Sequence, residues 1–174
     1  DGGIFRPVTL LGIETARLDS VYIRQVHKDG KVLLVPEVDV ETVDEEESEA
    51  DGYEGAQALE YQVTVTAPNG TKTIWDDCPD EMEIENPQLW WPNGLGEQPL
   101  YQVQVDLKAG DKIVDTWCRK IGLRTLTMHV EKDQWGESFA HEVNGYQVFA
   151  MGADYIPEDN LLQRTSRERT RELL

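Results

Sequence analysis

Residues 19–128 are dominated by short segments in which apolar and polar side chains alternate. A period of two is expected of a strand that buries one of its faces. The alternation is clearest over residues 59–66 and 101–108, and turn-forming residues separate the segments at regular intervals. No segment with helical periodicity interrupts them. The pattern predicts an all-β fold, an immunoglobulin-like antiparallel β-sandwich, over residues 19–128.

Within this sandwich, three hairpin turns are predicted at Lys28–Lys31, Pro68–Thr71 and Ala109–Lys112. Pro36 lies inside the expected strand from Val32 to Val40 and indicates an edge or a bulge, because proline cannot donate to a neighbouring strand. Residues 113–128 predict either a strand pair or one strand with a bulge. Residues 72–80 are short and mixed in character. The acidic segment 44–56 is predicted to be a loop.

Charge and composition limit the classes of partner. The chain has 34 acidic and 16 basic residues among 174, a formal net charge of −18. Such acidity opposes binding to nucleic acid or to anionic lipid. No apolar run approaches the ~20 residues that a membrane-spanning helix needs. Cys78 and Cys118 give no disulfide framework, which favours a cytoplasmic protein. The histidine and cysteine spacings predict no metal site, and no cofactor is expected.

Two adjacent tryptophans lie in a segment rich in proline, glycine and asparagine, residues 86–101. The segment reads as a loop, yet burying one such ring removes roughly 150–250 Å² of surface from water. Trp90 and Trp91 are therefore expected to lie against something. A neighbouring domain, the core of the sandwich itself and a bound sugar are the alternatives. With Asn93, they are the candidates for a domain interface or for sugar stacking.

Residues 129–174 have a different pattern. Asn144-Gly145 is expected to join two hairpin strands, 139–143 and 146–151. The continuous apolar run Val148–Met151 is typical of a strand buried on both faces, as in a parallel sheet. Thr165–Glu168 has the form of a capping box that opens a helix. Strand, polar loop and capped helix together predict the first βα unit of an α/β domain, such as a barrel, cut short, over 129–174.

The acids of this tail are the candidates for a substrate pocket. Asp154 and Asp159 follow the expected barrel strand, and active sites of barrel enzymes lie at that end. Tyr155 beside Asp154 offers an apolar ring next to a hydrogen-bond acceptor. Turn formation by the aspartates is the alternative. No nucleophile elbow, phosphate loop or dinucleotide fingerprint is present, and no catalytic carboxylate pair is expected within the chain.

Several stretches resemble glycoside hydrolase family 2, and within it the β-mannosidase branch. In chain order they are Gly3–Val8, Asn86–Gly94, Gln98–Tyr101, Lys120–Arg124, Val143–Gly145 and Gly152–Pro157. The first resembles the end of the family's N-terminal sugar-binding-like domain, which predicts that residues 1–18 close a preceding β domain. The last resembles the entry to the family's catalytic barrel. Asp154 stands where this branch usually has asparagine.

The resemblance implies a retaining exo-β-mannosidase acting on β-linked mannosides. Its acid/base and nucleophile, both glutamates, would lie on later barrel strands, outside these residues. The chain itself is then expected to be inactive, to brace the barrel and the sugar pocket, and to have the flanking domains of its parent as partners. Another β-glycosidase of the family (β-galactosidase, β-glucuronidase or exo-glucosaminidase) and a free-standing carbohydrate-binding module remain the alternatives.

Overall fold

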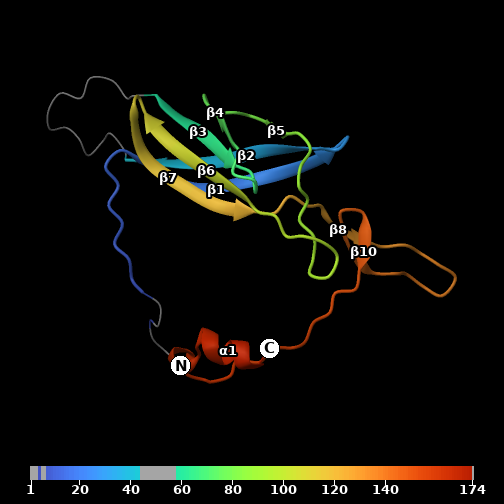
Figure 1. The fold of residues 1–174 in the computed structure, drawn as a ribbon. Coiled ribbons are helices and arrows are strands. Elements are labelled where there is room, and N and C mark those ends of the chain that lie inside the picture. Colours follow the sequence, from blue (N-terminus) through green and yellow to red (C-terminus); the bar gives the residue numbers. More distant parts are fainter. Residues whose placement is uncertain (1–3, 5–6, 44–57, 174) are drawn as a thin grey trace. The chain divides into compact units, whose positions relative to one another are not determined.

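The computed structural model describes residues 4, 7–43 and 58–173 (Figure 1). The chain divides into two compact units. The larger is Ile13–Phe149, and the smaller combines Asp1–Gly12 with Ala150–Leu174. The acidic segment 44–56, predicted to be a loop, lies outside the described residues. No described helix has the length and apolar character that crossing a bilayer would demand.

Two antiparallel sheets form the body of the larger unit (Figure 1). The first has three strands in the order β1 (Ala16–Lys28), β2 (Lys31–Thr42), β5 (Met82–Ile84). The second has four strands in the order β4 (Lys72–Trp75), β3 (Leu59–Thr66), β6 (Tyr101–Ala109), β7 (Lys112–Ile121). The predicted antiparallel β-sandwich is therefore confirmed.

The core lies between these two sheets and comes from the alternating apolar positions. Val63, Val103 and Val105 of the larger sheet are fully buried, as are Leu34 and Met82 of the smaller one. Fully burying a side chain of this size contributes roughly 1.5–3 kcal/mol each. Many of the intervening positions of β3 and β6 carry polar residues, so the apolar side chains of the larger sheet are concentrated on the face that meets the core.

The predicted hairpin turns form because their residues tolerate a positive φ. Asp29 and Gly30, at φ 51° and 77°, join β1 to β2, and Gly110 at φ 58° joins β6 to β7. At the third turn, Asn69 Oδ1 accepts a hydrogen bond of 3.0 Å from the backbone N of Thr71. Residues with a short polar side chain, or none, adopt this region of backbone space at the least cost.

Of the two settings predicted for Pro36, an edge or a bulge, the structure shows the edge. It pairs with Ile23 of β1 without a register shift, whereas β5 pairs only with residues 32–34 of β2. At Pro36, β2 therefore has a partner strand on one side only, which is a setting that proline tolerates. The bulge in this hairpin falls instead between Leu18 and Ser20 of β1.

The expectation of one strand with a bulge over 113–128 holds only in part. The pairing of β7 with β6 does shift register, opposite Leu107 and Lys108, but the strand does not continue to residue 128. β7 ends at Ile121, and Leu126–His129 form β8 in a third sheet with β9 (Ala140–Val143) and β10 (Tyr146–Val148). Residues 122–125 lie beyond the β6 ladder, whose last pair is Tyr101 with Ile121. Leu123 instead forms a bridge with Leu89 of the tryptophan segment. Residues 72–80, which gave no clear pattern, contain β4.

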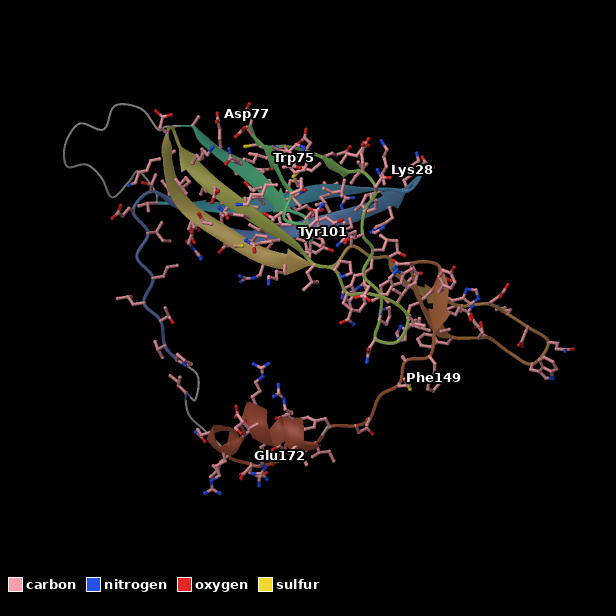
Figure 2. All side chains as sticks on the ribbon, in the orientation of Figure 1. Lys28, Trp75, Asp77, Tyr101, Phe149 and Glu172 are labelled. Atoms are coloured by element: carbon pink, nitrogen blue, oxygen red, sulfur yellow. The ribbon has the colours of Figure 1, made fainter. Side chains whose placement is uncertain are left out.

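The predicted hairpin about Asn144-Gly145 is confirmed by the pairing of β9 with β10. The predicted buried strand over 148–151 is wrong. β10 ends at Val148, and the next apolar side chains, Phe149 and Met151, are 88% and 86% exposed. Figure 2 shows Phe149 on the segment without strand structure that follows β10. A strand buried on both faces needs layers on both sides, and the described residues provide none there.

In the smaller unit, a short 3₁₀ turn, η2 (Leu162–Arg164), precedes α1 (Arg167–Leu173). The predicted helix start is confirmed, with Ser166 as the capping residue. Ser166 Oγ accepts a hydrogen bond of 3.2 Å from the backbone N of Arg169. Residues 7–12 form no strand, so none of the described residues before β1 supplies the expected closing strand. The expected domain boundaries after 18 and 128 fall inside β1 and β8.

Candidate functional site

The tryptophan loop, residues 86–100, runs beside the end of β7. Its backbone is held there by the bridge between Leu89 and Leu123 and by a hydrogen bond of 2.9 Å from Trp90 N to Leu123 O. Leu123 is completely buried in the sandwich core. The loop therefore replaces a regular strand partner at this edge of the larger sheet, although it carries no strand pattern of its own.

Trp90 packs between a glycine and an arginine. A Cβ placed on Gly122 would lie 2.8 Å from Trp90 Cγ, so the indole approaches the backbone more closely than any side chain at 122 would allow. On the same ring, the Arg124 guanidinium carbon lies 4.3 Å from the centroid. This is a cation–π contact, and such contacts contribute about 0.5–1 kcal/mol at partly exposed sites.

Trp91 makes the corresponding contacts on the other side of the loop. A Cβ on Gly96 would lie 2.9 Å from Trp91 Cγ, and the Tyr146 ring of β10 meets the indole edge-on with centroids 5.5 Å apart. Trp91 N donates to Glu97 O at 3.0 Å, which closes the loop. Both tryptophans are half-buried, whereas Asn93, at the tip of the loop, is exposed.

Asn144 connects the tryptophan loop to the third sheet. Its Nδ2 donates to Trp90 O at 3.0 Å, and its Oδ1 accepts from Thr125 N at 3.0 Å. Its own backbone N donates to Thr125 O at 3.2 Å. Asn144 adopts φ 51°, a left-handed value that asparagine accepts more readily than most residues. One residue thus forms the β9–β10 turn and bridges two other segments.

Gln25 of β1 plays a similar part from the smaller sheet. Its Nε2 donates to Gly122 O at 3.1 Å, and its Oε1 accepts from Arg124 N at 3.1 Å. The same oxygen lies 3.1 Å from Nε2 of His27. Burial lowers the pKa of His27, against a smaller opposing effect of a backbone hydrogen bond with Arg124. The neutral imidazole is therefore favoured at this position.

The pocket candidates from the tail lie in the smaller unit. Asp154 is exposed, and Tyr155 is 57% exposed. Tyr155 Oη donates to Glu158 Oε1 at 2.8 Å, and this hydrogen bond, with a smaller contribution from burial, raises the pKa of the phenol. Asp159 caps the following turn, since its Oδ1 accepts from Leu161 N at 2.8 Å.

Glu158 is the acid that holds this segment to α1. Its side chain is 3% exposed, and Arg169 Nε lies 2.8 Å from Oε2. Thr170 Oγ1 donates to the other carboxylate oxygen at 3.1 Å. No local pattern in the sequence marks Glu158 as a site residue, and none marks Gln25, Gly122 or Arg124. The one related signal in the sequence is the capping pattern at Thr165–Glu168, which predicts the helix that supplies Arg169 and Thr170.

The predicted site residues thus fall into two sets, one in each compact unit. Trp90 and Trp91 form a packed junction between the sandwich and the third sheet. Asp154, Tyr155 and Asp159 lie on one short segment, where an exposed carboxylate and an exposed ring are adjacent. Within the described residues, no cluster of three or more potential ligands could hold a metal ion.

A family model described as glycosyl hydrolases family 2 matches residues 16–124. Beta-mannosidase B of Thermothelomyces thermophilus is 35% identical over 96% of this chain and 19% of its own length. Beta-mannosidase B of Aspergillus oryzae is 30% identical over 97% of this chain and 20% of its own length. The chain therefore spans about a fifth of the length of these curated relatives.

Comparison with solved structures agrees with these sequence matches. The β-D-mannosidase of Dictyoglomus thermophilum superposes with a TM-score of 0.69 at 26% identity, over 94% of this chain and 20% of that one. A Ruminococcus gnavus β-glucuronidase superposes with a TM-score of 0.55 at 15% identity, over 79% of this chain and 19% of that one, which shows a shared fold alone. From the family match over the sandwich and the near-complete coverage by these relatives, the chain belongs to glycosyl hydrolase family 2, in its β-mannosidase branch.

Proposed function

We propose that this chain is the sandwich portion of a retaining exo-β-mannosidase and that it braces the catalytic barrel without carrying catalytic residues. The observation that supports this most directly is coverage: the β-mannosidase relatives match nearly the whole chain with only a fifth of their own length. Four-fifths of such an enzyme, including its two catalytic glutamates, would therefore lie outside these residues.

In a retaining glycosidase, two carboxyl groups about 5–5.5 Å apart act as acid/base and nucleophile. The part proposed for this chain is to fix the direction in which the polypeptide enters the barrel. The seven strands, divided between sheets of three and four, have the division found in constant-type immunoglobulin domains. Asn144 and the two tryptophans attach the third sheet to this sandwich, and that sheet leads directly into segment 149–157.

Residues 150–174 are proposed to be the start of the barrel, with residues 1–12 as the end of a preceding domain. On this proposal Asp154 accepts hydrogen bonds from sugar hydroxyls, and the exposed face of Tyr155 forms an apolar wall beside them. Asp159 instead shapes the loop through its bond to Leu161 N. The exposure of Asp154 and Tyr155 supports this assignment, because a subsite residue must reach its ligand.

The binding-module alternative has less support. Both tryptophans that such a module would offer to a sugar are already packed against the chain's own Gly122, Arg124, Gly96 and Tyr146. A ring used for stacking needs an open face. The other β-glycosidases of the family remain an alternative for the substrate alone.

The test is hydrolysis of a panel of aryl β-glycosides by the complete parent protein and by this chain. The expected result is activity of the parent on the β-mannoside, with no activity of the chain. Preference for a galactoside, glucuronide or glucosaminide would be compatible with the family assignment but would reject the β-mannoside as the substrate. In the parent, Asp154→Ala is expected to lower kcat/KM, whereas Asp133→Ala, in an exposed turn, serves as the matched control.

Activity of the chain by itself would reject the non-catalytic role. No hydrolysis of any glycoside by the parent would reject the enzyme proposal and favour the binding module, for which affinity for mannose oligosaccharides would then be the measurement. Equal kcat/KM for Asp154→Ala and Asp133→Ala would remove Asp154 from the pocket.

A further inference from the structure

An open groove lies in the larger unit between β1 and β7, the outer strands of the two sheets on one side of the sandwich. Its volume is about 830 Å³. We call it the basic groove, because four of its lining residues are cations: Arg24, Arg119, Lys120 and Arg124. Tyr22, Trp117, Leu100 and Leu126 provide its apolar walls.

The charge of this groove is opposite to that of the chain. Acids outnumber bases by 34 to 16 in the whole sequence. The residues that line the groove nevertheless include four Lys or Arg and no Asp or Glu. The fold has therefore separated the charges and gathered a quarter of the bases at one sandwich edge. The groove is therefore expected to attract anions locally, although the net charge of the chain is negative.

Most of these cations also lack an acidic partner within the described part of the chain. Arg24 pairs with Glu37 at 3.0 Å. Arg119 lies 5.7 Å from the centroid of the Trp117 ring and donates to Cys118 O, while Arg124 lies over Trp90. The described ion pairs include none formed by Arg119, Lys120 or Arg124.

Protection of open sheet edges is one explanation for cations at this place, because charged side chains discourage pairing with another strand. That explanation does not account for the apolar walls. Tyr22 is 62% exposed, Leu126 59% and Leu100 44%, all beside the cations. Apolar side chains next to a protective charge would favour association rather than prevent it. The combination is that of a binding surface with a charged rim and apolar contacts.

We propose that the basic groove docks a carboxylate-bearing segment of the parent protein that lies outside residues 1–174. The inference rests on the proposed function only in requiring a larger parent. The relatives' length leaves about four-fifths of such a protein to provide the segment. Guanidinium groups such as those of Arg119 and Arg124, which form no ion pair among the described residues, bind carboxylates through paired, charge-assisted hydrogen bonds. A second copy of the chain is disfavoured, because two bodies of charge −18 repel each other.

The experiment is zero-length cross-linking of the complete parent with a water-soluble carbodiimide. The reagent activates a carboxyl group and is released as its urea when the Lys120 amine forms an amide with the carboxyl carbon. Peptide mass spectrometry then identifies the partner acid. The expected product joins the Lys120 peptide to a peptide outside residues 1–174. Its yield is expected to fall about fivefold at 1 M salt, where the Debye length is about 3 Å rather than about 8 Å.

Lys120→Arg keeps the charge and removes the amine, so this variant should lose the cross-link while keeping the fold. Arg119→Glu with Lys120→Glu should lower the parent's thermal unfolding temperature. The matched charge change Lys72→Glu with Lys132→Glu, away from the groove lining, should lower it less. Equal effects of the two double variants would overturn the proposal.

A cross-link from Lys120 to an acid within residues 1–174, or none at all, would also overturn it. A cross-link between isotope-labelled and unlabelled copies would assign the groove to self-association instead. These readouts do not depend on glycosidase activity. A parent that cross-links as expected but hydrolyses no mannoside would reject the proposed function and retain the docking surface.

Discussion

Trp90 and Gly122 are in such close contact that a single methyl group at residue 122 would lie 2.8 Å from Trp90 Cγ and 2.9 Å from Trp90 Cβ. Gly122 does not adopt an unusual backbone conformation, so this glycine is required for space rather than for flexibility. The contact occurs where β7 ends and the tryptophan loop begins to pair with Leu123. It therefore decides how tightly the loop can approach the sandwich.

Gly122→Ala is expected to destabilise the chain by roughly 1–3 kcal/mol, the usual cost of adding a methylene to a packed site. Gly136→Ala is the matched control, since a Cβ there meets nothing within 4 Å. The free energy of unfolding of both variants would be measured by chemical denaturation. Equal stability of the two variants would mean that Trp90 moves away without cost.

Asn144→Gly is expected to cost about 1–3 kcal/mol of stability, because it leaves Trp90 O and Thr125 N without their side-chain partner. Glycine keeps the positive φ of the turn, and the entropy that glycine adds to the unfolded chain is shared by the control variant. Asn93→Gly, at an exposed position, is the control. A loss no greater than that of Asn93→Gly in a denaturant titration would contradict the bridging role.

His27 is expected to make stability depend on pH. Burial lowers its pKa in the folded state, so the unfolded chain binds its proton more readily. Stability from this group is complete above the ordinary histidine pKa of about 6.5 and declines as the pH falls below it. Between about pH 7.5 and about pH 5.5, the wild type should lose more unfolding free energy than His27→Gln. A smaller loss in the wild type would mean that folding raises the pKa of His27 instead of lowering it.

Limited chymotrypsin digestion is expected to cut first within 149–155. Phe149 and Met151 are almost fully exposed on a segment without strand structure. The stable product should end near Phe149 and retain the third sheet, which Asn144 and Tyr146 attach to the tryptophan loop. Cleavage after the exposed Trp135 would not release a fragment, because the segments before and after the cut stay held together by the pairing of β8 with β9. A first cut within 122–128 would instead support the domain boundary that the sequence predicted after residue 128.

Glu158→Ala is expected to loosen α1. This helix of seven residues is too short to be stable alone in water, and Glu158 contacts both Arg169 and Thr170. A loss of roughly 1 kcal/mol would accelerate hydrogen exchange of the helix amides about fivefold. Asp154→Ala, on the same segment but exposed, should leave their exchange unchanged. Identical exchange in both variants would remove Glu158 from this role.

The strands could be predicted because their signals are local. Side chains at positions 59–66 and 101–108 alternate regardless of which strand they meet, and Asp29-Gly30 favours a hairpin through its own backbone preferences. The same reasoning failed at Val148–Met151. A continuous apolar run indicates only that burial of its side chains would be favourable. Burial also requires packing partners from other segments, which the run itself does not specify.

The fold class, the hairpin turns and the family follow from short-range alternation, turn residues and ordered motifs, all of which are local to the chain. The folded arrangement was needed to show that β8 leaves the sandwich for a third sheet and that Trp90 packs against Gly122. It alone placed Arg119 and Lys120 across a groove from Arg24. These contacts join residues tens of positions apart, and packing between distant segments depends on the whole arrangement of the sheets rather than on any local pattern.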